Sequence, residues 1–133
     1  MLNNKITATR WLIKNAPPKL QPYLKLARVE HPIGTWLLLW PCWWSIAIGT
    51  KGPPSLLYLT LFAIGAVVMR GAGCCWNDIT DRDLDGLVER TSSRPIPAGQ
   101  ITVFKAILFM IILCSIGFII LLSLNKFSIF LGL

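Results

Sequence analysis

The chain is poor in charged residues, and above all in acidic ones. Only 14% of its 133 residues are Asp, Glu, Lys or Arg, whereas roughly a quarter of an average soluble domain is charged. Six acidic residues stand against thirteen basic ones, which gives a formal net charge of +7. Apolar residues make up 54% of the chain, and the mean hydropathy is +0.61. This composition excludes a disordered chain. It also argues against a nucleic-acid binder, because the basic residues form no single patch.

The sequence also lacks the usual ligands of a thiol or imidazole metal site. It has one histidine, and none of its four cysteines forms a C-x-x-C pair. These cysteines are Cys42, Cys74, Cys75 and Cys114. Packing between helices is the simplest role for such small side chains. Nothing in the sequence therefore indicates a zinc site or a disulfide framework.

Long stretches without charge predict membrane-spanning helices. No Asp, Glu, Lys or Arg occurs in residues 31–50, 52–69 and 106–125. Because a helix needs about 20 apolar residues to cross the hydrocarbon core, we expect spans at about 33–50, 55–75 and 103–124. A fourth apolar run covers only 127–133, and seven helical residues rise only about 10 Å. The sequence thus predicts an all-α, polytopic transmembrane helical bundle of three spans plus the start of a fourth.

We expect residues 1–133 to form a single membrane domain. Because the chain ends inside an unfinished span, it reads as a fragment, a split protein or a truncated product. Residues 1–30 and the loop 76–102 both carry several basic residues, whereas the connection near 50–54 carries only Lys51. This alternation places 1–30 and 76–102 together on the cytoplasmic side, or on the matrix side in a mitochondrion. The basic N-terminal segment is predicted to lie on the anionic inner leaflet, with a mitochondrial transit peptide as the alternative.

Five of the six acidic residues lie in the segment 70–99. Asn77, Asp81 and Asp85 follow one another at intervals of four, so on a helix they would form one stripe about 80° wide. Like charges at this spacing destabilise a helix by a few tenths of a kcal/mol, which favours a ligand-binding role. Carboxylate and amide oxygens suit Mg²⁺, which leaves coordination sites for water and substrate phosphates.

Two arginines follow the acidic stripe. Arg90 and Arg94 can bind phosphate oxygens with their planar guanidinium groups, so the segment predicts a magnesium-diphosphate site. Two alternatives stay open. The charges of a solvated loop could pair among themselves, or a calcium loop could begin at Asp81, where D-x-D-x-D-G occurs. The calcium reading requires a Glu at the twelfth position, where this sequence has Ser92.

Arg70 is an ionisable residue within a predicted span. Facing lipid at the bilayer centre would cost at least ~2.5 kcal/mol, so we expect Arg70 to face a polar cavity and to have a partner. The alternative is an arginine that extends towards the cytoplasmic interface.

These residues resemble the UbiA superfamily of intramembrane prenyltransferases. The pattern N-x-x-x-D-x-x-x-D at Asn77, Asp81 and Asp85, continued by Arg90-Thr91 and Arg94-Pro95, is similar to the family's first aspartate-rich motif. The stretches HPIGT at 31–35 and MRGAGC at 69–74 resemble the branch that prenylates 4-hydroxybenzoate in ubiquinone biosynthesis. The likeness runs from about residue 23 to residue 125.

The resemblance implies the N-terminal portion of a nine-helix fold that opens to the cytoplasm. It implies Mg²⁺ as cofactor, with polyprenyl diphosphate and 4-hydroxybenzoate as substrates. The setting would be the bacterial inner membrane or, alternatively, the mitochondrial inner membrane. On this pattern Asn77, Asp81 and Asp85 bind the metal, and Asn77, Arg90 and Arg94 contact the diphosphate. Asp81, Asp85 and Arg70 are the expected catalytic residues, with Arg70 as a charge partner near the aromatic acid or the diphosphate.

One departure from the family pattern concerns its second aspartate-rich motif. The chain has no acidic residue after Glu89, so half of the implied metal site is missing. We therefore expect the 133-residue chain alone to be inactive or to need a complementing partner. Two alternatives remain: a member of the superfamily with another acceptor (a naphthoate, homogentisate or haem), or a small non-catalytic membrane protein that binds a partner or divalent ions.

Overall fold

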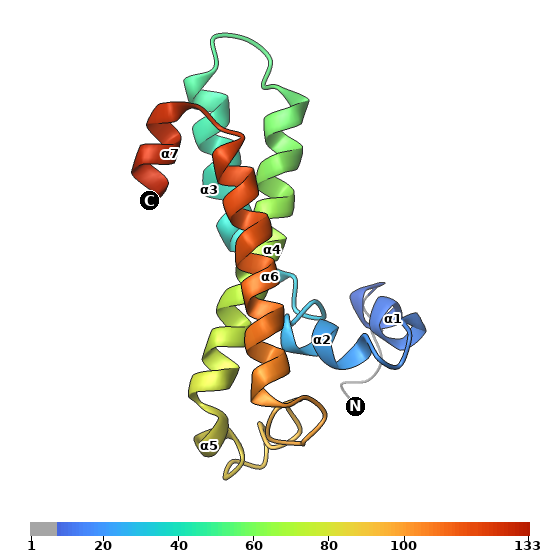
Figure 1. Cartoon of the computed structure of the whole chain (residues 1–133). Coiled ribbons are helices and arrows are strands. Elements are labelled where there is room, and N and C mark those ends of the chain that lie inside the picture. The colour runs from blue at the N-terminus through green and yellow to red at the C-terminus, as the bar shows by residue number, and fades with distance from the viewer. Residues whose placement is uncertain (1–7) are drawn as a thin grey trace.

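The computed structural model describes residues 8–133, with side chains from Trp11 onwards, and this part of the chain is helical without strands (Figure 1). Its helices are α1 (Ala8–Asn15), α2 (Gln21–Leu26), α3 (Ile33–Gly49), α4 (Leu56–Thr80), α5 (Arg82–Asp85), α6 (Val103–Leu122) and α7 (Lys126–Gly132). The all-α prediction is confirmed. Residues 1–7 of the predicted basic segment 1–30 lie outside the described residues.

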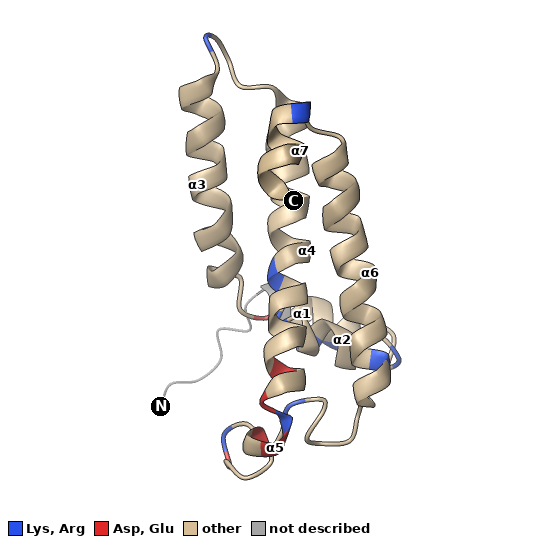
Figure 2. Cartoon of the chain, turned by 60° about the vertical axis from the view of Figure 1, so that its left-hand side comes forward, with Lys and Arg blue, Asp and Glu red and all other residues tan. Residues whose placement is uncertain are grey.

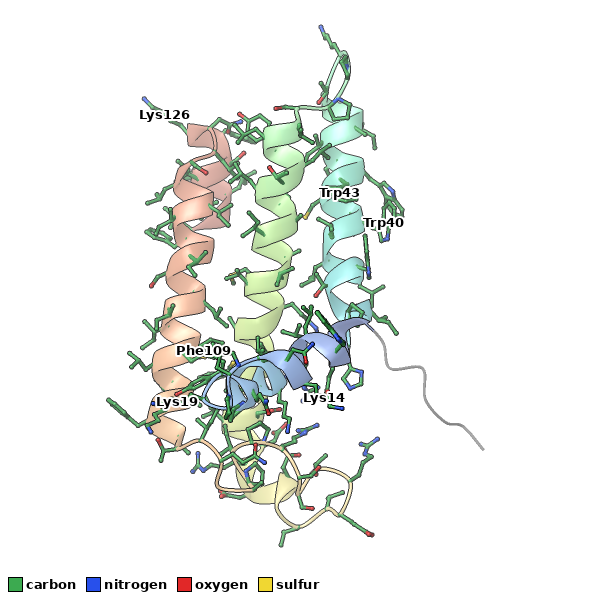
Figure 3. All side chains as sticks on the ribbon, turned by 90° about the vertical axis from the view of Figure 1, so that its right-hand side faces the viewer. Lys14, Lys19, Trp40, Trp43, Phe109 and Lys126 are labelled. Atoms are coloured by element: carbon green, nitrogen blue, oxygen red, sulfur yellow. The ribbon has the colours of Figure 1, made fainter. Side chains whose placement is uncertain are left out.

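Three long helices run side by side, and α4 lies between α3 and α6 (Figure 3). Helices α4 and α6 are long and apolar enough to cross a membrane, and α3 is a shorter apolar helix of 17 residues. The three helices coincide with the predicted spans at 33–50, 55–75 and 103–124. Many large apolar side chains along them are exposed, such as Leu37, Ile48 and Phe104. An apolar surface of this extent needs lipid or protein to cover it.

Helix α4 extends five residues beyond the predicted end of its span at 75. No glycine or proline interrupts residues 76–80, and Ile79 is buried on the same helix face as Cys75. The helix ends at Asp81, whose backbone (φ −91°, ψ 6°) is not helical, and α5 begins directly afterwards. The predicted loop 76–102 therefore starts as helix, which fixes the direction of the first acidic side chains.

The charged segments gather at one end of the bundle (Figure 2). Helices α1 and α2 lie there together with α5 and the following loop, whereas the α3–α4 connection lies at the opposite end (Figure 1). This is the arrangement that the alternation of basic residues predicts for 1–30 and 76–102. Which side of a membrane this end faces stays a prediction.

The best-packed region also lies at the charged end. Leu26 of α2, Cys75 and Ile79 of α4, and Ala106 of α6 form a buried cluster, which is completed by loop residues 96 and 101. The Tyr23 ring of α2 packs edge-on against the Phe109 ring of α6, with centroids 5.1 Å apart. The loop 86–102 is thus held against the bundle by its own apolar side chains, and it presents its charged residues from a fixed backbone.

Tryptophan side chains join α3 to α4. The Trp36, Trp40 and Trp43 rings lie on one face of α3, with centroids 5.7–6.4 Å apart. The Trp43 indole N–H donates a hydrogen bond to the Leu59 carbonyl of α4 at 3.1 Å. Trp40 lies on the outer side of α3 (Figure 3). The pair of helices is therefore held by one partly buried hydrogen bond as well as by apolar packing.

Two glycines of α4 provide a matched test of this packing. A Cβ atom at Gly71 would lie 3.2 Å from the Leu113 side chain and 3.3 Å from Ala27, whereas at Gly73 it would meet nothing within 4 Å. We expect Gly71→Val to lower the free energy of unfolding by about 1–3 kcal/mol, because it forces α6 and α2 away from α4. Gly73→Val carries the same change in helix propensity and should leave stability nearly unchanged. Thermal denaturation in detergent measures both variants, and an equal loss in both would contradict this packing.

Candidate functional site

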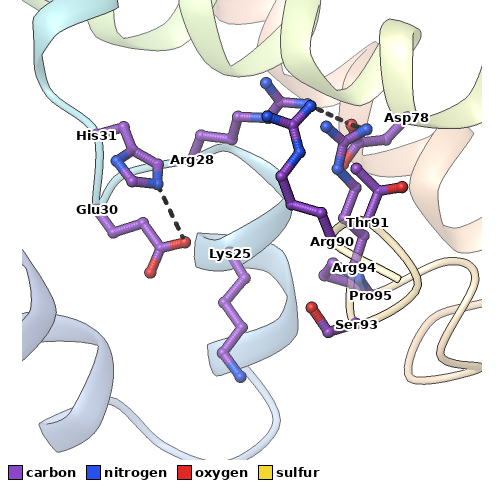
Figure 4. A pocket seen from close by; sticks show the side chains of 10 residues that line it. All are labelled: Lys25, Arg28, Glu30, His31, Asp78, Arg90, Thr91, Ser93, Arg94 and Pro95. Carbon is purple, nitrogen blue, oxygen red and sulfur yellow. Dashed lines mark hydrogen bonds and ion pairs between the residues drawn. The ribbon is translucent and has the colours of Figure 1, made fainter. Parts of the chain in front are cut away.

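A buried carboxylate lies at the centre of the charged end. The Asp78 side chain of α4 is 2% exposed. Its Oδ1 atom accepts a hydrogen bond from Arg28 Nη2 at 2.8 Å and another from Arg94 Nη1 at 3.3 Å (Figure 4). Arg94 Nη1 also donates to Asp85 Oδ2. We call these four residues the charge clamp, because they connect α2, α4, α5 and the loop 86–102.

Arg28 occupies a backbone conformation that usually requires glycine. Its φ is +52°, and it follows α2 in a Schellman motif. In this motif the Val29 N–H donates to the Leu24 carbonyl at 3.2 Å, and the Arg28 N–H donates to the Lys25 carbonyl at 3.0 Å. A left-handed non-glycine residue costs of order 1 kcal/mol or more. The reversal of the chain directs the Arg28 side chain towards Asp78.

The Arg28 guanidinium stays protonated and positively charged. Burial lowers the pKa of its guanidinium, but the hydrogen bond from Arg28 to Asp78 and the negative charge of Asp78 outweigh burial, so the pKa lies above its ordinary value. A permanently charged group at this position keeps the mouth of the bundle cationic at every accessible pH.

A polar pocket of about 300 Å³ opens beside the clamp. It is lined by Lys25, Arg28, Glu30, His31, Asp78, Arg90, Thr91, Ser93, Arg94 and Pro95 (Figure 4). Four basic side chains therefore stand against two carboxylates, and one of those carboxylates is already shared by two arginines. Such a pocket favours a multiply charged anion such as a diphosphate.

A second, apolar cavity of about 440 Å³ adjoins this pocket. It lies between α2, α3, α4 and α6 and is lined by residues such as Leu24, Trp36, Val67 and Phe109. Arg28 lines both cavities. A guanidinium group therefore stands where a polar pocket meets an apolar one.

The predicted stripe of Asn77, Asp81 and Asp85 is divided. Asn77 and Asp81 are exposed at the end of α4, whereas Asp85 is buried and bonded to Arg94. The division has two physical causes: the helix is interrupted at Asp81, and Asp85 turns towards the arginine of the following loop. The proposed roles of these residues therefore differ by environment, with two oxygens open to a ligand and one held in an ion pair.

The three arginines of the predicted site lie in two different places. Arg90 and Arg94 both line the polar pocket, as a diphosphate contact would require. Arg70 lies apart from that pocket, against Gly34 in the first turn of α3.

Two residues of the clamp were not among the predicted site residues. Asp78 is adjacent to Asn77 in sequence, and only the continuation of α4 to Thr80 turns its side chain inward. Arg28 comes from a short amphipathic segment 50 residues away, so no local pattern indicates its partner. The one available signal was an arginine in the segment 1–30, which is predicted to lie on the same side of the membrane as the loop 76–102.

The metal prediction can be compared with the donor atoms. Over the residues that the structure describes, no group of three or more His, Cys, Asp or Glu side chains could enclose a metal ion. Asn77 and Asp81 lie one helical turn apart and are both exposed. An amide and a carboxylate oxygen fit an open Mg²⁺ site, because that ion keeps several waters and uses substrate phosphates as ligands. They do not form a closed site by themselves.

The fold and this site define a helical membrane-type protein with a pocket rich in basic side chains at the end of its bundle. Residues 38–133 match the UbiA prenyltransferase family. The chain belongs to this family.

Named relatives extend over most of the chain. It is 48% identical over 116 residues to a 4-hydroxybenzoate octaprenyltransferase of Tolumonas auensis, covering 87% of this chain and 41% of that protein. It is 50% identical over 123 residues to the mitochondrial 4-hydroxybenzoate polyprenyltransferase of Caenorhabditis elegans, covering 91% of this chain and 35% of that protein. The corresponding Arabidopsis thaliana protein is 47% identical over 124 residues, which are 92% of this chain and 30% of that protein. The chain thus spans well under half the length of these relatives. No solved structure matches it.

The charge clamp makes a direct prediction about stability. Asp78→Asn leaves Arg28 and Arg94 without their shared carboxylate, and we expect it to lower the free energy of unfolding by about 2–3 kcal/mol. This is below the roughly 3–5 kcal/mol typical of a broken buried ion pair, because both arginines keep some contact with solvent. Asp83→Asn is the matched control, since the Asp83 side chain is 86% exposed, and it should change stability by less than about 0.5 kcal/mol. If the two variants melt at the same temperature, the clamp does not stabilise the fold.

Proposed function

We propose that this chain takes part in the transfer of a polyprenyl group from its diphosphate to the ring of 4-hydroxybenzoate, a step of ubiquinone biosynthesis. The setting is the inner membrane of a bacterium or a mitochondrion, with the charged end of the bundle on the cytoplasmic or matrix side. The names of the relatives support the substrates. The family supports the use of a divalent metal, and we propose that this metal is Mg²⁺.

The observation that carries the proposal is the cationic pocket beside exposed oxygen ligands. Arg90 and Arg94 line this pocket, and Asn77 and Asp81 lie exposed at the same end of α4. A metal-bound diphosphate needs both kinds of group, because the metal shares some phosphate oxygens and guanidinium groups bind the others. Asp85 is bonded to Arg94. If a bound anion takes its place as the acceptor of Arg94, Asp85 becomes available as a third ligand of the proposed metal.

The apolar cavity supports the polyprenyl part of the substrate. It adjoins the polar pocket at Arg28, so a diphosphate in the polar pocket would direct the attached isoprene units between α2, α3 and α4. Its lining of large apolar side chains, such as Trp36 and Phe109, suits an apolar chain and offers few partners to water. Exclusion of water protects a reactive allylic centre from hydrolysis.

The chemistry can be written so that bonds and charges balance. The bond between the first prenyl carbon and the diphosphate oxygen breaks, and the diphosphate leaves with the electron pair. A carbon–carbon bond forms at the ring position next to the hydroxyl group, and that ring carbon loses its proton to solvent. Arg90 and Arg94 bind the leaving diphosphate, and Asp78 keeps Arg28 and Arg94 in position. Mg²⁺, when bound by Asn77 and Asp81, neutralises charge that develops on the leaving group.

Removal of one oxygen ligand tests the proposal. In the presence of the complementing partner that the 133-residue chain is expected to need, Asp81→Asn should reduce prenyl transfer to labelled 4-hydroxybenzoate at least about 100-fold, by analogy with the loss of one charge-stabilising group from an active site. Asp83→Asn, two residues further on and also exposed, should keep the rate of the unaltered protein. Binding of labelled polyprenyl diphosphate with and without Mg²⁺ is measured in parallel, so that the result does not depend on turnover alone.

Other outcomes would redirect the proposal. Transfer to a naphthoate or homogentisate in place of 4-hydroxybenzoate would keep the family chemistry and change the acceptor. If the protein does not bind polyprenyl diphosphate at all, or if Asp81→Asn binds and reacts like the unaltered protein, a non-catalytic role becomes the better explanation.

A further inference from the structure

A groove opens at the surface between α2 and α6, at the charged end of the bundle. It has a volume of about 260 Å³ and is lined by Leu20, Tyr23, Lys105, Leu108, Phe109 and Ile112. It shares Phe109 with the apolar cavity described above, and it shares no residue with the polar pocket. The groove thus combines five apolar or aromatic side chains with one basic residue, and the proposed reaction makes no use of that basic residue.

The lining of the groove changes from charged to apolar along α6. Lys105, Leu108 and Ile112 follow one another at intervals of three and four, so they lie on one face of the helix. Lys105 is in the first turn of α6, and Ile112 lies about 10 Å further along the axis. Helix α6 is long and apolar enough to cross a membrane. In a bilayer, Lys105 therefore lies near the lipid headgroups, and the apolar part of the groove faces the acyl chains.

The basic side chains at the groove have no acidic partner. Lys19 and Lys105 are exposed, and neither forms an ion pair with a described residue. Lys19 immediately precedes Leu20 and lies at the same end of the bundle as Phe109 (Figure 3). The Tyr23 hydroxyl likewise has no hydrogen-bond partner among the described residues. The charged end of the groove therefore offers two cations and a hydroxyl donor, all of them available to an anion.

A groove at the opposite end of the bundle differs in charge. It has a volume of about 410 Å³, and its lining residues include Tyr58, Phe62 and Leu124. No charged side chain of the described residues lines it. Both grooves offer apolar and aromatic surface to lipid, but of the two only the groove between α2 and α6 adds a cation.

We propose that the groove between α2 and α6 binds an anionic phospholipid, with its phosphate at Lys105 and one acyl chain along Leu108 and Ile112. Lys19 supplies a second positive charge. The ligand must be amphipathic, because a cationic rim adjoins an apolar floor. A soluble phosphate would leave the apolar floor uncovered, and a zwitterionic lipid carries its own ammonium group, which competes with the lysines for the phosphate. Basic residues next to a membrane-spanning helix attract anionic lipids in this way.

A lipid in this groove would also affect the charge clamp. The edge-on contact between the Tyr23 and Phe109 rings forms part of the groove wall, so an acyl chain packs against α2 and α6 together. Arg28 comes directly after the C-cap of α2 and donates the 2.8 Å hydrogen bond to Asp78. A bound lipid therefore stabilises the position of α2 and, with it, the position of this arginine.

Native mass spectrometry of the purified protein in detergent measures the lipids that stay bound. Phosphatidylglycerol is compared with phosphatidylcholine that has the same acyl chains. We expect Lys105→Gln to weaken binding of phosphatidylglycerol about fivefold, the loss typical of one basic residue near an anionic lipid surface. Binding of phosphatidylcholine should change less than about twofold. Lys126→Gln is the matched control, because Lys126 also begins a helix but lies at the opposite end of the bundle (Figure 3), and it should change neither.

Two isoleucines of α6 test the apolar part of the groove. Ile112 lines the groove, whereas Ile119 lies seven residues further on the same helix face and outside it. Both side chains are at least half exposed, so each position accepts a larger residue. We expect Ile112→Trp to weaken binding of phosphatidylglycerol at least about tenfold, since each acyl CH₂ group that loses its contact weakens binding about fourfold. Ile119→Trp should leave binding unchanged, and without lipid both variants should melt like the unaltered protein.

Several results would overturn the inference while the proposed function stands. Equal binding of phosphatidylglycerol and phosphatidylcholine would do so, as would an equal loss in Lys105→Gln and Lys126→Gln. Displacement of the lipid by soluble glycerol phosphate at constant ionic strength would assign the groove to a free phosphate. Displacement by polyprenyl diphosphate would assign it to the donor substrate.

Discussion

The shared carboxylate of Asp78 is the interaction on which the charged end of this protein depends. It is buried at the foot of the central helix and accepts hydrogen bonds from Arg28, which precedes α4 in the sequence, and from Arg94, which follows it. Because a buried charge without a partner is costly, the two arginines and the carboxylate must be placed together, and the polar pocket takes its lining from that arrangement.

The central helix α4 presents different chemistry on its two sides. The side that carries Cys75, Asp78 and Ile79 packs into the bundle and supports α2 and the loop. A neighbouring face carries Arg70, Asn77 and Asp81, which are wholly or partly exposed. The charges that hold the fold and the charges that we propose to bind a ligand therefore lie on different faces of one helix. This separation allows a side chain of the open face to be changed without breaking the clamp.

The helices could be predicted from sequence because their cause is local. Long stretches without charge have few alternatives to a membrane-length helix, and α3, α4 and α6 lie where these stretches lie. The candidate site was harder to predict from the sequence. The stripe of Asn77, Asp81 and Asp85 assumed one continuous helix, whereas the backbone changes direction at Asp81. Asp78 and Arg28 depend on a contact across 50 residues, which helical periodicity cannot indicate. Arg70 was expected to have a partner, and its Nε atom lies beside Gly34 of α3 without a hydrogen bond to any described residue.

The left-handed backbone of Arg28 has a consequence for how this sequence can vary. The left-handed backbone at that turn favours glycine, whereas the Asp78 carboxylate requires an arginine at the same position. One residue cannot meet both requirements. Such a conflict is local frustration in the energy landscape, and natural sequences retain it mainly where function requires it. Replacing Arg28 by glycine would remove the backbone strain at the turn. It would also remove a side chain that lines the polar pocket and binds Asp78.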